Sequence, residues 1–191
     1  MAKRPKTKTP IMLPDQERFM AFEGLLQWTQ AVVTQSARVS RADARQSSSC
    51  ALSPSTPQRR LEATKQRHQA ILAFHTECHF FAIAAYKLLE YRDWVRTFGL
   101  CASVDFGEID QFSEQNIRDL RNMREHVVDY FRGIGREPDR WLVETPEYRG
   151  DASGRTGTMI GSRLDWVAFG AAAERLLPQL LAEPVPYPPR T

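Results

Sequence analysis

SEQNIRDLRNMREHVVDYF, residues 113–131, has the pattern of an amphipathic helix. Ser113 is suited to accept hydrogen bonds from the free backbone N–H groups at its start, and Glu114 suits the positive end of the helix dipole. Gly133 follows and predicts the end of the helix. The side chains expected on its apolar face, near helical spacing, are those of Ile117, Leu120, Val127, Val128 and Phe131.

The middle of this stretch, RNMREH, is the densest cluster of polar and charged side chains in the chain. Five positions separate Arg121 from His126, which turns a helix about 140° beyond a full turn, so the two side chains do not share one narrow stripe. Arg121 and Glu125 are spaced i,i+4, as are Asn122 and His126, and an ordinary helix surface satisfies such pairs internally. Spacing alone therefore leaves two interpretations open, a functional site and a plain helix surface.

Two long helices are expected before this stretch. The first covers residues 14–36, and the second covers residues 56–98 with Thr56 as N-cap and Pro57 at the first helical position. The second contains no Pro or Gly after its start, and its middle is apolar nearly all round, which places it in the centre of a bundle. Residues 37–55 are small and polar and are expected to form a mobile loop.

The amino-acid composition changes after residue 131, where Gly and Pro become frequent. Two short strands, 141–145 and 156–160, are expected to pair as an antiparallel β-hairpin within residues 141–161. A last helix is expected over residues 162–182, with Ser162 as its cap. The sequence thus predicts a mainly α fold, a four-helix-type bundle with a small β-hairpin insertion before the last helix.

The chain of 191 residues suits one domain, expected over residues 14–182 between a disordered basic tail (1–13) and a Pro-rich tail (183–191). The first tail carries four basic residues and no acid, so the rest of the chain has a net charge of −1 against +3 for the whole. Such a tail can help to hold a polyanion, or simply aid solubility. No apolar run is long enough to span a bilayer, so no membrane partner is expected.

The cysteines, the other histidines and the remaining motifs indicate neither a metal site nor a cofactor site. The three cysteines form no CxxC pair, which argues against a disulfide framework and for the reducing cytoplasm. His75 and His79, with Cys78 between them, have the i,i+4 spacing of half a metal site, but no second ligand cluster accompanies them. Histidines satisfied at a helix–helix contact are the favoured interpretation. The sequence also lacks a nucleophile elbow, a phosphate-binding Gly-rich loop and an HExxH motif.

The phrase IRDLRNMREHVVDYF, together with AAYKLLEYRDW in the preceding long helix, resembles the HEPN domains. These are helical bundles marked by an R-x4–6-H motif in which a polar residue commonly follows the Arg. Arg121, Asn122 and His126 match that pattern, and the resemblance covers residues 56–132 best. It implies metal-independent RNA cleavage in a cleft between two protomers, so RNA and a second copy of the chain are the expected partners.

The resemblance also implies a role for each motif residue. His126 would transfer the proton when the RNA 2′-hydroxyl attacks the neighbouring phosphorus, because imidazole ordinarily titrates near pH 6.5. Arg121 would hold the phosphate and stabilise the transition state, with Asn122 orienting the His or bonding a phosphate oxygen. The residues expected to assist in substrate binding are Arg124, Glu90 and Asp93.

Three functional interpretations remain open at this point. The first is a HEPN-type ribonuclease, a toxin or stress-response enzyme held in check by a protein antitoxin or inhibitor. The second is a non-catalytic helical module that binds RNA, a nucleotide or a protein through the same Arg and His. The near-neutral body of the chain favours the second, because a nuclease groove is usually richer in Lys and Arg. The third is a structural bundle whose motif is ordinary surface.

Overall fold

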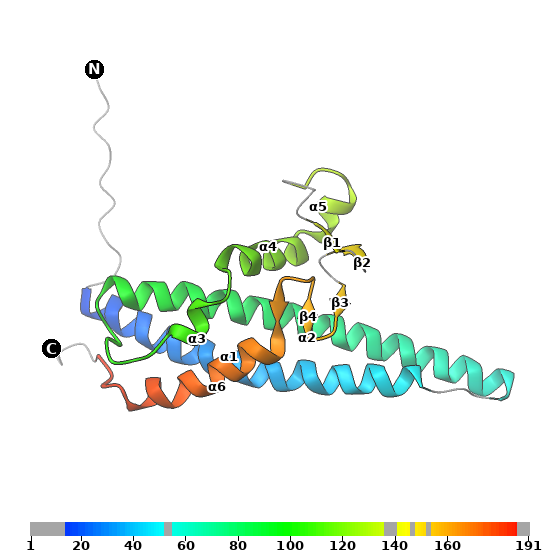
Figure 1. Ribbon diagram of the computed structural model, residues 1–191, viewed down its shortest axis with the longest axis horizontal. Helices are drawn as coiled ribbons and strands as arrows, with labels where there is room; N and C mark the ends of the chain where they lie inside the picture. Colours follow the sequence, from blue (N-terminus) through cyan, green and yellow to red (C-terminus); the bar gives the residue numbers. More distant parts are fainter. Residues whose placement is uncertain (1–13, 52–54, 136–140, 146–147, 152–153, 187–191) are drawn as a thin grey trace, which may run out of the picture.

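The computed structural model is mainly helical, with short antiparallel strands before the last helix, as the sequence predicts (Figure 1). It describes residues 14–51, 55–135, 141–145, 148–151 and 154–186, so the tail expected over residues 1–13 and most of the one after 182 lie outside the described residues. The helices are α1 (Pro14–Cys50), α2 (Pro57–Thr97), α3 (Gly107–Asp110), α4 (Glu114–Glu125), α5 (Val127–Phe131) and α6 (Trp166–Ala182). The strands are β1 (Leu142–Thr145), β2 (Tyr148–Asp151), β3 (Arg155–Thr156), β4 (Met159–Ile160) and β5 (Leu164–Asp165).

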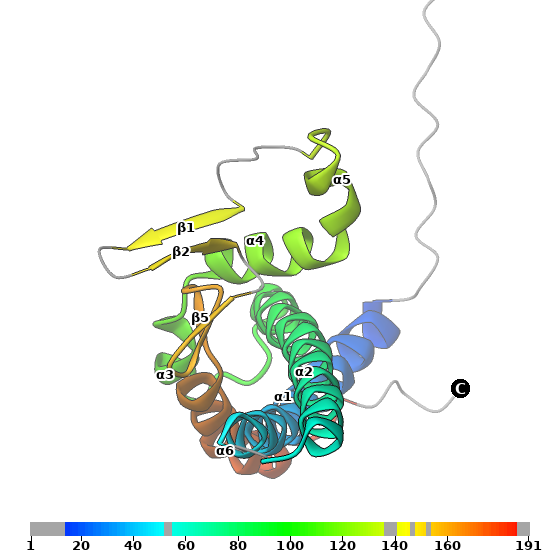
Figure 2. The same ribbon diagram turned by 90° about the vertical axis from the view of Figure 1, so that its right-hand side faces the viewer.

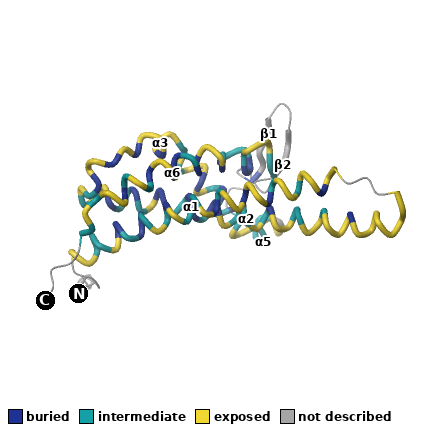
Figure 3. Tube along the Cα trace, turned by 90° about the horizontal axis from the view of Figure 1, so that it is seen from below, coloured by how far each residue is buried: buried dark blue, intermediate teal, exposed yellow. Residues whose placement is uncertain are grey.

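The long helices α1 and α2 lie side by side and form the axis of the molecule (Figure 1). Figure 2 looks almost along them and shows α6 packed beside α1, whereas α4 lies on α2. The buried residues follow the inner sides of these helices (Figure 3). No helix in the described ranges has an apolar segment of the length that a bilayer crossing requires. The largest fully buried side chains include Phe74, Phe81, Phe169, Leu25, Leu88 and Leu89.

The first helix is much longer than predicted, since α1 continues through the expected loop at residues 37–55 as far as Cys50. No Pro or Gly interrupts this part, and its Ala, Arg and Gln residues are compatible with a helix. The helix persists because it pairs with the first half of α2 and buries Val39, Ala42 and Ser49. The loop prediction was wrong because low aliphatic content was taken to exclude packing.

Local signals at the helix ends are confirmed. Thr56 caps α2, its side chain accepting a hydrogen bond from the backbone N–H of Arg59, and Ser113 caps α4 in the same way. Gly99 follows α2 with φ +62°, a left-handed conformation that Gly adopts without strain. The cap of α6 differs from the prediction, because the carboxylate of Asp165 rather than Ser162 accepts the first free N–H groups.

The stretch 113–131 is two helices rather than one. α4 ends at Glu125 and α5 begins at Val127, with His126 between them at φ −108° and ψ 26°. The break is followed by two β-branched residues, which are weak helix formers. It turns the chain, so Val128 is 54% exposed instead of continuing the apolar face. Met123 is buried in that face together with Ile117 and Leu120.

The β insertion before α6 is present, but its strands pair differently from the prediction. β1 pairs with β2, and β4 lies between β3 and β5 in a separate three-stranded sheet. The segments predicted as partners, 141–145 and 156–160, therefore belong to different sheets. Each instead pairs with a nearby segment, which requires a shorter loop to close.

Gly24 in α1 packs so closely against α2 that a Cβ there would overlap the ring of Tyr91. Gly→Ala in a helix ordinarily stabilises by about 1 kcal/mol. Here we expect Gly24→Ala to lower the free energy of unfolding by about 1–3 kcal/mol, because the packed Tyr91 ring must move. Urea denaturation followed by circular dichroism measures it.

The control for this substitution is the same change in a Tyr91→Ala background. With the ring removed, Gly24→Ala should be neutral or stabilising, giving a positive coupling in the double-mutant cycle. A stabilising effect in the parent chain would contradict the packing of α1 on α2 described above.

Candidate functional site

His126 occupies the junction between α4 and α5, and its side chain is 60% exposed. Its backbone N–H still donates to the carbonyl of Asn122, 2.9 Å away, which closes the last turn of α4. Its Nδ1 lies 3.6 Å from the Oδ2 of Asp129, the residue one turn further along. The break thus presents an accessible imidazole beside a carboxylate, close enough to pair electrostatically when the imidazole is protonated.

His126 and Asn122 line the same cavity, of about 380 Å³, which we call the His126 pocket. Its far wall comes from the turn after α5, where a Cβ on Gly135 would lie 2.6 Å from the Tyr130 ring. The Tyr130 ring in turn stacks on Trp141, with ring centroids 5.0 Å apart. The residues lining the pocket are Asn122, His126, Asp129, Tyr130, Ile134 and Gly135.

The guanidinium of Arg121 is not among the groups that line this pocket in the described chain. Its Nη2 pairs with the Oε2 of Glu125 at 2.8 Å, and its Cζ lies 5.5 Å from the ring centroid of Tyr86 in α2. Its Nη1 donates to the Oδ1 of Asn122 at 2.9 Å. The i,i+4 pair expected of an ordinary helix surface is therefore formed, and Arg121 reaches the pocket only through Asn122.

Arg124 lies in a second depression, the Arg124 groove, with a volume of about 430 Å³. Its Nη1 donates to the backbone carbonyl of His75 at 3.1 Å. The groove therefore joins α4 to the histidines of α2 that the sequence analysis treated separately. The residues lining it are Leu72, His75, Thr76, His79, Arg124, Val127 and Trp141.

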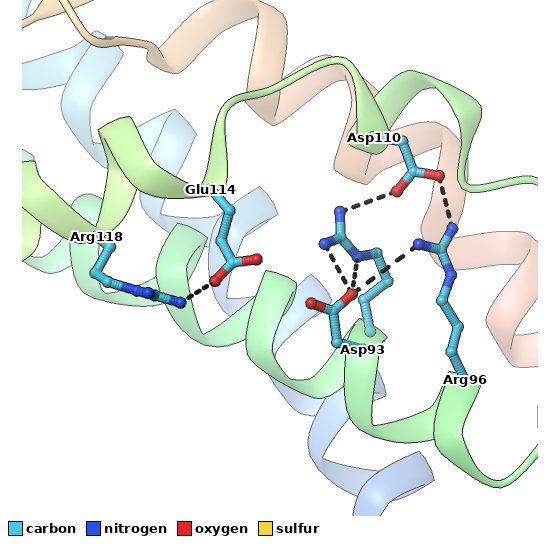
Figure 4. Close-up of polar contacts among 6 residues, drawn as sticks. Asp93, Arg96, Asp110, Glu114 and Arg118 are labelled. Carbon is cyan, nitrogen blue, oxygen red and sulfur yellow. Dashed lines mark hydrogen bonds and ion pairs between the residues drawn. The ribbon is translucent and has the colours of Figure 1, made fainter.

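Glu90 and Asp93, the other predicted substrate-binding residues, line neither depression. Glu90 pairs with Lys87 at 2.5 Å on the surface of α2. Asp93 contacts the buried guanidinium of Arg92, which also pairs with Asp110 of α3 at 2.9 Å. Figure 4 shows this network, in which Asp110 also binds Arg96. Asp93 thus belongs to a contact that fastens α3 to the end of α2.

Among the described residues, no three His, Cys, Asp or Glu side chains gather as ligands for a metal ion. The thiol between the two histidines of α2 is buried, and burial raises the pKa of Cys78 to about 12. A thiol with that pKa is almost entirely protonated near neutral pH, so Cys78 is not a candidate nucleophile.

The sequence pointed to Asn122, His126 and Arg124 but missed their neighbours. Asp129 had a signal, since it stands three residues after His126 at helical spacing. Tyr130 and Trp141 had none, because their contact depends on the turn after α5. The participation of His75 in the groove also depends on how α4 packs on α2.

Comparison with protein-family models, with curated proteins and with solved structures found no match to this chain.

The stability of the fold is expected to depend on pH through His79, which lines the Arg124 groove. Burial lowers its pKa below the ordinary value of 6.5, and the positive charge of Arg124 lowers it further. The unfolded chain then binds this proton more readily than the folded one, so His79 costs no stability above pH 6.5 and reduces stability as the pH falls below it.

We expect His79→Gln to reduce the loss of unfolding free energy between pH 7.5 and pH 5, measured by urea denaturation. Only the difference between the two pH values is compared, because the substitution also changes packing. His68→Gln, at an exposed position on the same helix, is the matched control and should keep the pH dependence of the parent chain. Identical pH dependence in His79→Gln and the parent would contradict the assignment.

Proposed function

We propose that the chain is a HEPN-type endoribonuclease that cleaves RNA at the His126 pocket. The observation that carries the proposal is the exposed imidazole of His126, set beside Asp129 and Asn122 in a cavity of about 380 Å³. A volume of that order is at the lower end of small-molecule sites and suits part of one nucleotide. The resemblance of residues 56–132 to HEPN domains supplies the reaction class.

The reaction needs only an acid–base group and donors for the phosphate. The 2′-oxygen of the RNA attacks the adjacent phosphorus while His126 accepts its proton, the bond from phosphorus to the 5′-oxygen breaks, and that oxygen leaves with a proton from solvent. The products are a 2′,3′-cyclic phosphate and a 5′-hydroxyl. Asp129 stabilises the imidazolium that forms, and the amide of Asn122 binds a phosphate oxygen.

Arg121 takes a different role in this proposal from the one expected of the motif. Since its charge is paired with Glu125, it acts as a positioning residue that holds the Asn122 side chain at the edge of the pocket.

A homodimer remains part of the proposal. The exposed apolar side chains of Val128 and Ile134, 54% and 67% exposed, lie at or beside the pocket and offer apolar surface to a second copy.

A second candidate, a non-catalytic module that binds a nucleotide or a protein, is favoured by one feature of the pocket. Among the described residues, the fully charged side chain that lines it is a carboxylate, Asp129, and the nearby Arg121 is already neutralised. An electrostatic preference for phosphate is therefore not built into the pocket of a single chain.

Cleavage of a defined RNA in EDTA tests the first candidate. We expect His126→Ala to lower the cleavage rate by about 100-fold or more, the usual contribution of a general acid–base group. His68→Ala removes an exposed histidine elsewhere on α2 and should keep the parent rate. Mass spectrometry of the products should show 2′,3′-cyclic phosphate ends.

Equal rates for the parent and His126→Ala would mean that the activity lies elsewhere or comes from a contaminant, and would overturn the proposal. No cleavage by a folded parent chain, shown by circular dichroism, would favour the binding module. Arg121→Ala separates the roles of the motif residues, because a positioning role predicts that Asn122→Ala and Arg121→Ala are not additive.

A further inference from the structure

The far ends of α1 and α2 form a two-helix projection that extends beyond the other elements of the fold (Figure 1). We call residues 38–51 and 55–67 the arm. Near the base of the arm, an ion pair between Asp43 and Arg155 of β3 connects it to the rest of the fold. Beyond that point the described residues are almost all at least partly exposed, with Ala63 and Ser49 buried between the two helices (Figure 3).

The arm is strongly basic. It contains seven Arg and Lys residues and two acids, a net charge of +5, whereas the whole chain carries +3, so everything outside the arm sums to −2. Both acids are already paired, Asp43 with Arg155 and Glu62 with Lys65. Five arginines are exposed and form no ion pair with any residue in the described ranges, namely Arg38, Arg41, Arg45, Arg59 and Arg60.

Three of these arginines form a line along α1. Arg38, Arg41 and Arg45 are spaced i, i+3 and i+7, which places them on one helix face over about 10 Å. Over that length a nucleic-acid duplex presents about six phosphate charges. The line ends at a groove of about 690 Å³ between the two helices, lined by Arg45 of α1 and by Gln66 and Gln69 of α2 together with Ala and Ser residues.

We propose that the arm binds the phosphodiester backbone of RNA, independently of base sequence. Guanidinium groups and neutral amide donors are the usual ligands of backbone phosphates, and such contacts fix position without reading sequence. A membrane surface is less well matched, because insertion requires an apolar face and the described part of the arm exposes only one large aliphatic side chain, Leu61.

The arm and the His126 pocket are separate places on the molecule, connected through α2, which forms one half of the arm and packs against α4, the helix that ends at the pocket. Arg60 precedes His75, whose carbonyl binds Arg124, by fifteen residues, or about 22 Å of continuous helix. An RNA that touches both must therefore be longer than a dinucleotide. The choice of RNA over DNA rests on the proposed ribonuclease function, whereas the binding of a phosphate backbone does not.

Fluorescence anisotropy with a 20-nucleotide 2′-O-methyl RNA tests the arm without any cleavage. In the full chain, Arg38→Gln/Arg41→Gln/Arg45→Gln should weaken binding about tenfold or more at 50 mM salt. It should also lower the slope of log K against log salt by about 2, three single-strand phosphate contacts at about 0.7 each. Gln favours a helix nearly as well as Arg, and the melting temperature checks that the fold is kept.

The matched control removes the same number of positive charges, three, from positions outside the arm. Lys87→Gln/Arg118→Gln/Arg175→Gln changes cations that are each already paired with a carboxylate, so it should leave the salt slope unchanged. Equal weakening in both triple variants would show an effect of net charge alone and would overturn the proposal. So would no detectable RNA binding by the parent, or tighter binding to anionic lipid vesicles than to RNA.

Two cleavage substrates separate this proposal from the ribonuclease proposal. The arm variant should cleave a dinucleotide at the parent rate and long RNA more slowly, whereas His126→Ala should fail on both. RNA binding through the arm with no cleavage of either substrate would leave the arm proposal standing and remove the ribonuclease proposal. A DNA of the same sequence shows whether the backbone alone suffices, and equal binding supports a site that reads phosphate only.

Discussion

The close packing of α1 on α2 is the contact on which the other elements depend. Gly24 leaves room for the ring of Tyr91, and the buried amide of Gln35 donates to the backbone carbonyl of Glu77 at 3.1 Å. The same amide also donates to the Glu77 carboxylate. These contacts fix how far one helix slides along the other, because a buried polar group that loses its hydrogen bonds costs free energy. Gly170 of α6 then approaches α1 closely at Ser36. With the register fixed, α2 presents one row of side chains to α4, and the Arg124 groove is built on that row.

The helices were predictable where a single residue marks the end of an element. Thr56 and Ser113 signal helix starts through their own side chains, and Gly133 allows a backbone conformation that other residues resist. The extent of α1 was not predictable from the small, polar composition of residues 37–55. That segment is helical because α2 lies against it, and the gain from pairing two helices is absent from any local pattern. The pairing of the strands likewise depends on which loops close most easily.

The candidate site was predictable in its residue types but not in its arrangement. The motif spacing assumed one continuous helix, whereas α4 ends before His126, whose imidazole lies beside Asp129 while Arg121 pairs with Glu125. The pairing of Arg121 with Glu125 was visible in the sequence as an i,i+4 spacing. The stacking of Tyr130 on Trp141 joins residues on either side of an irregular segment, and no periodic pattern describes such a segment.

The proposed ribonuclease function requires that a pocket lined by the carboxylate of Asp129 be compatible with a polyanionic substrate, and the charge distribution offers an explanation. Asp129 lines the pocket, and Arg121 outside it is paired with Glu125, so in the proposed function the affinity for RNA comes from elsewhere on the chain. The unpaired arginines of the arm lie on the same helices that support the site, and α2 runs without a break from Arg60 to Tyr86, about 39 Å. Because that connection is a helix rather than a flexible linker, an RNA held by its backbone on the arm stays within a fixed distance of His126. The distance between the arm and the pocket then sets the effective concentration of the RNA at the pocket, and the pocket needs to supply only the catalytic groups.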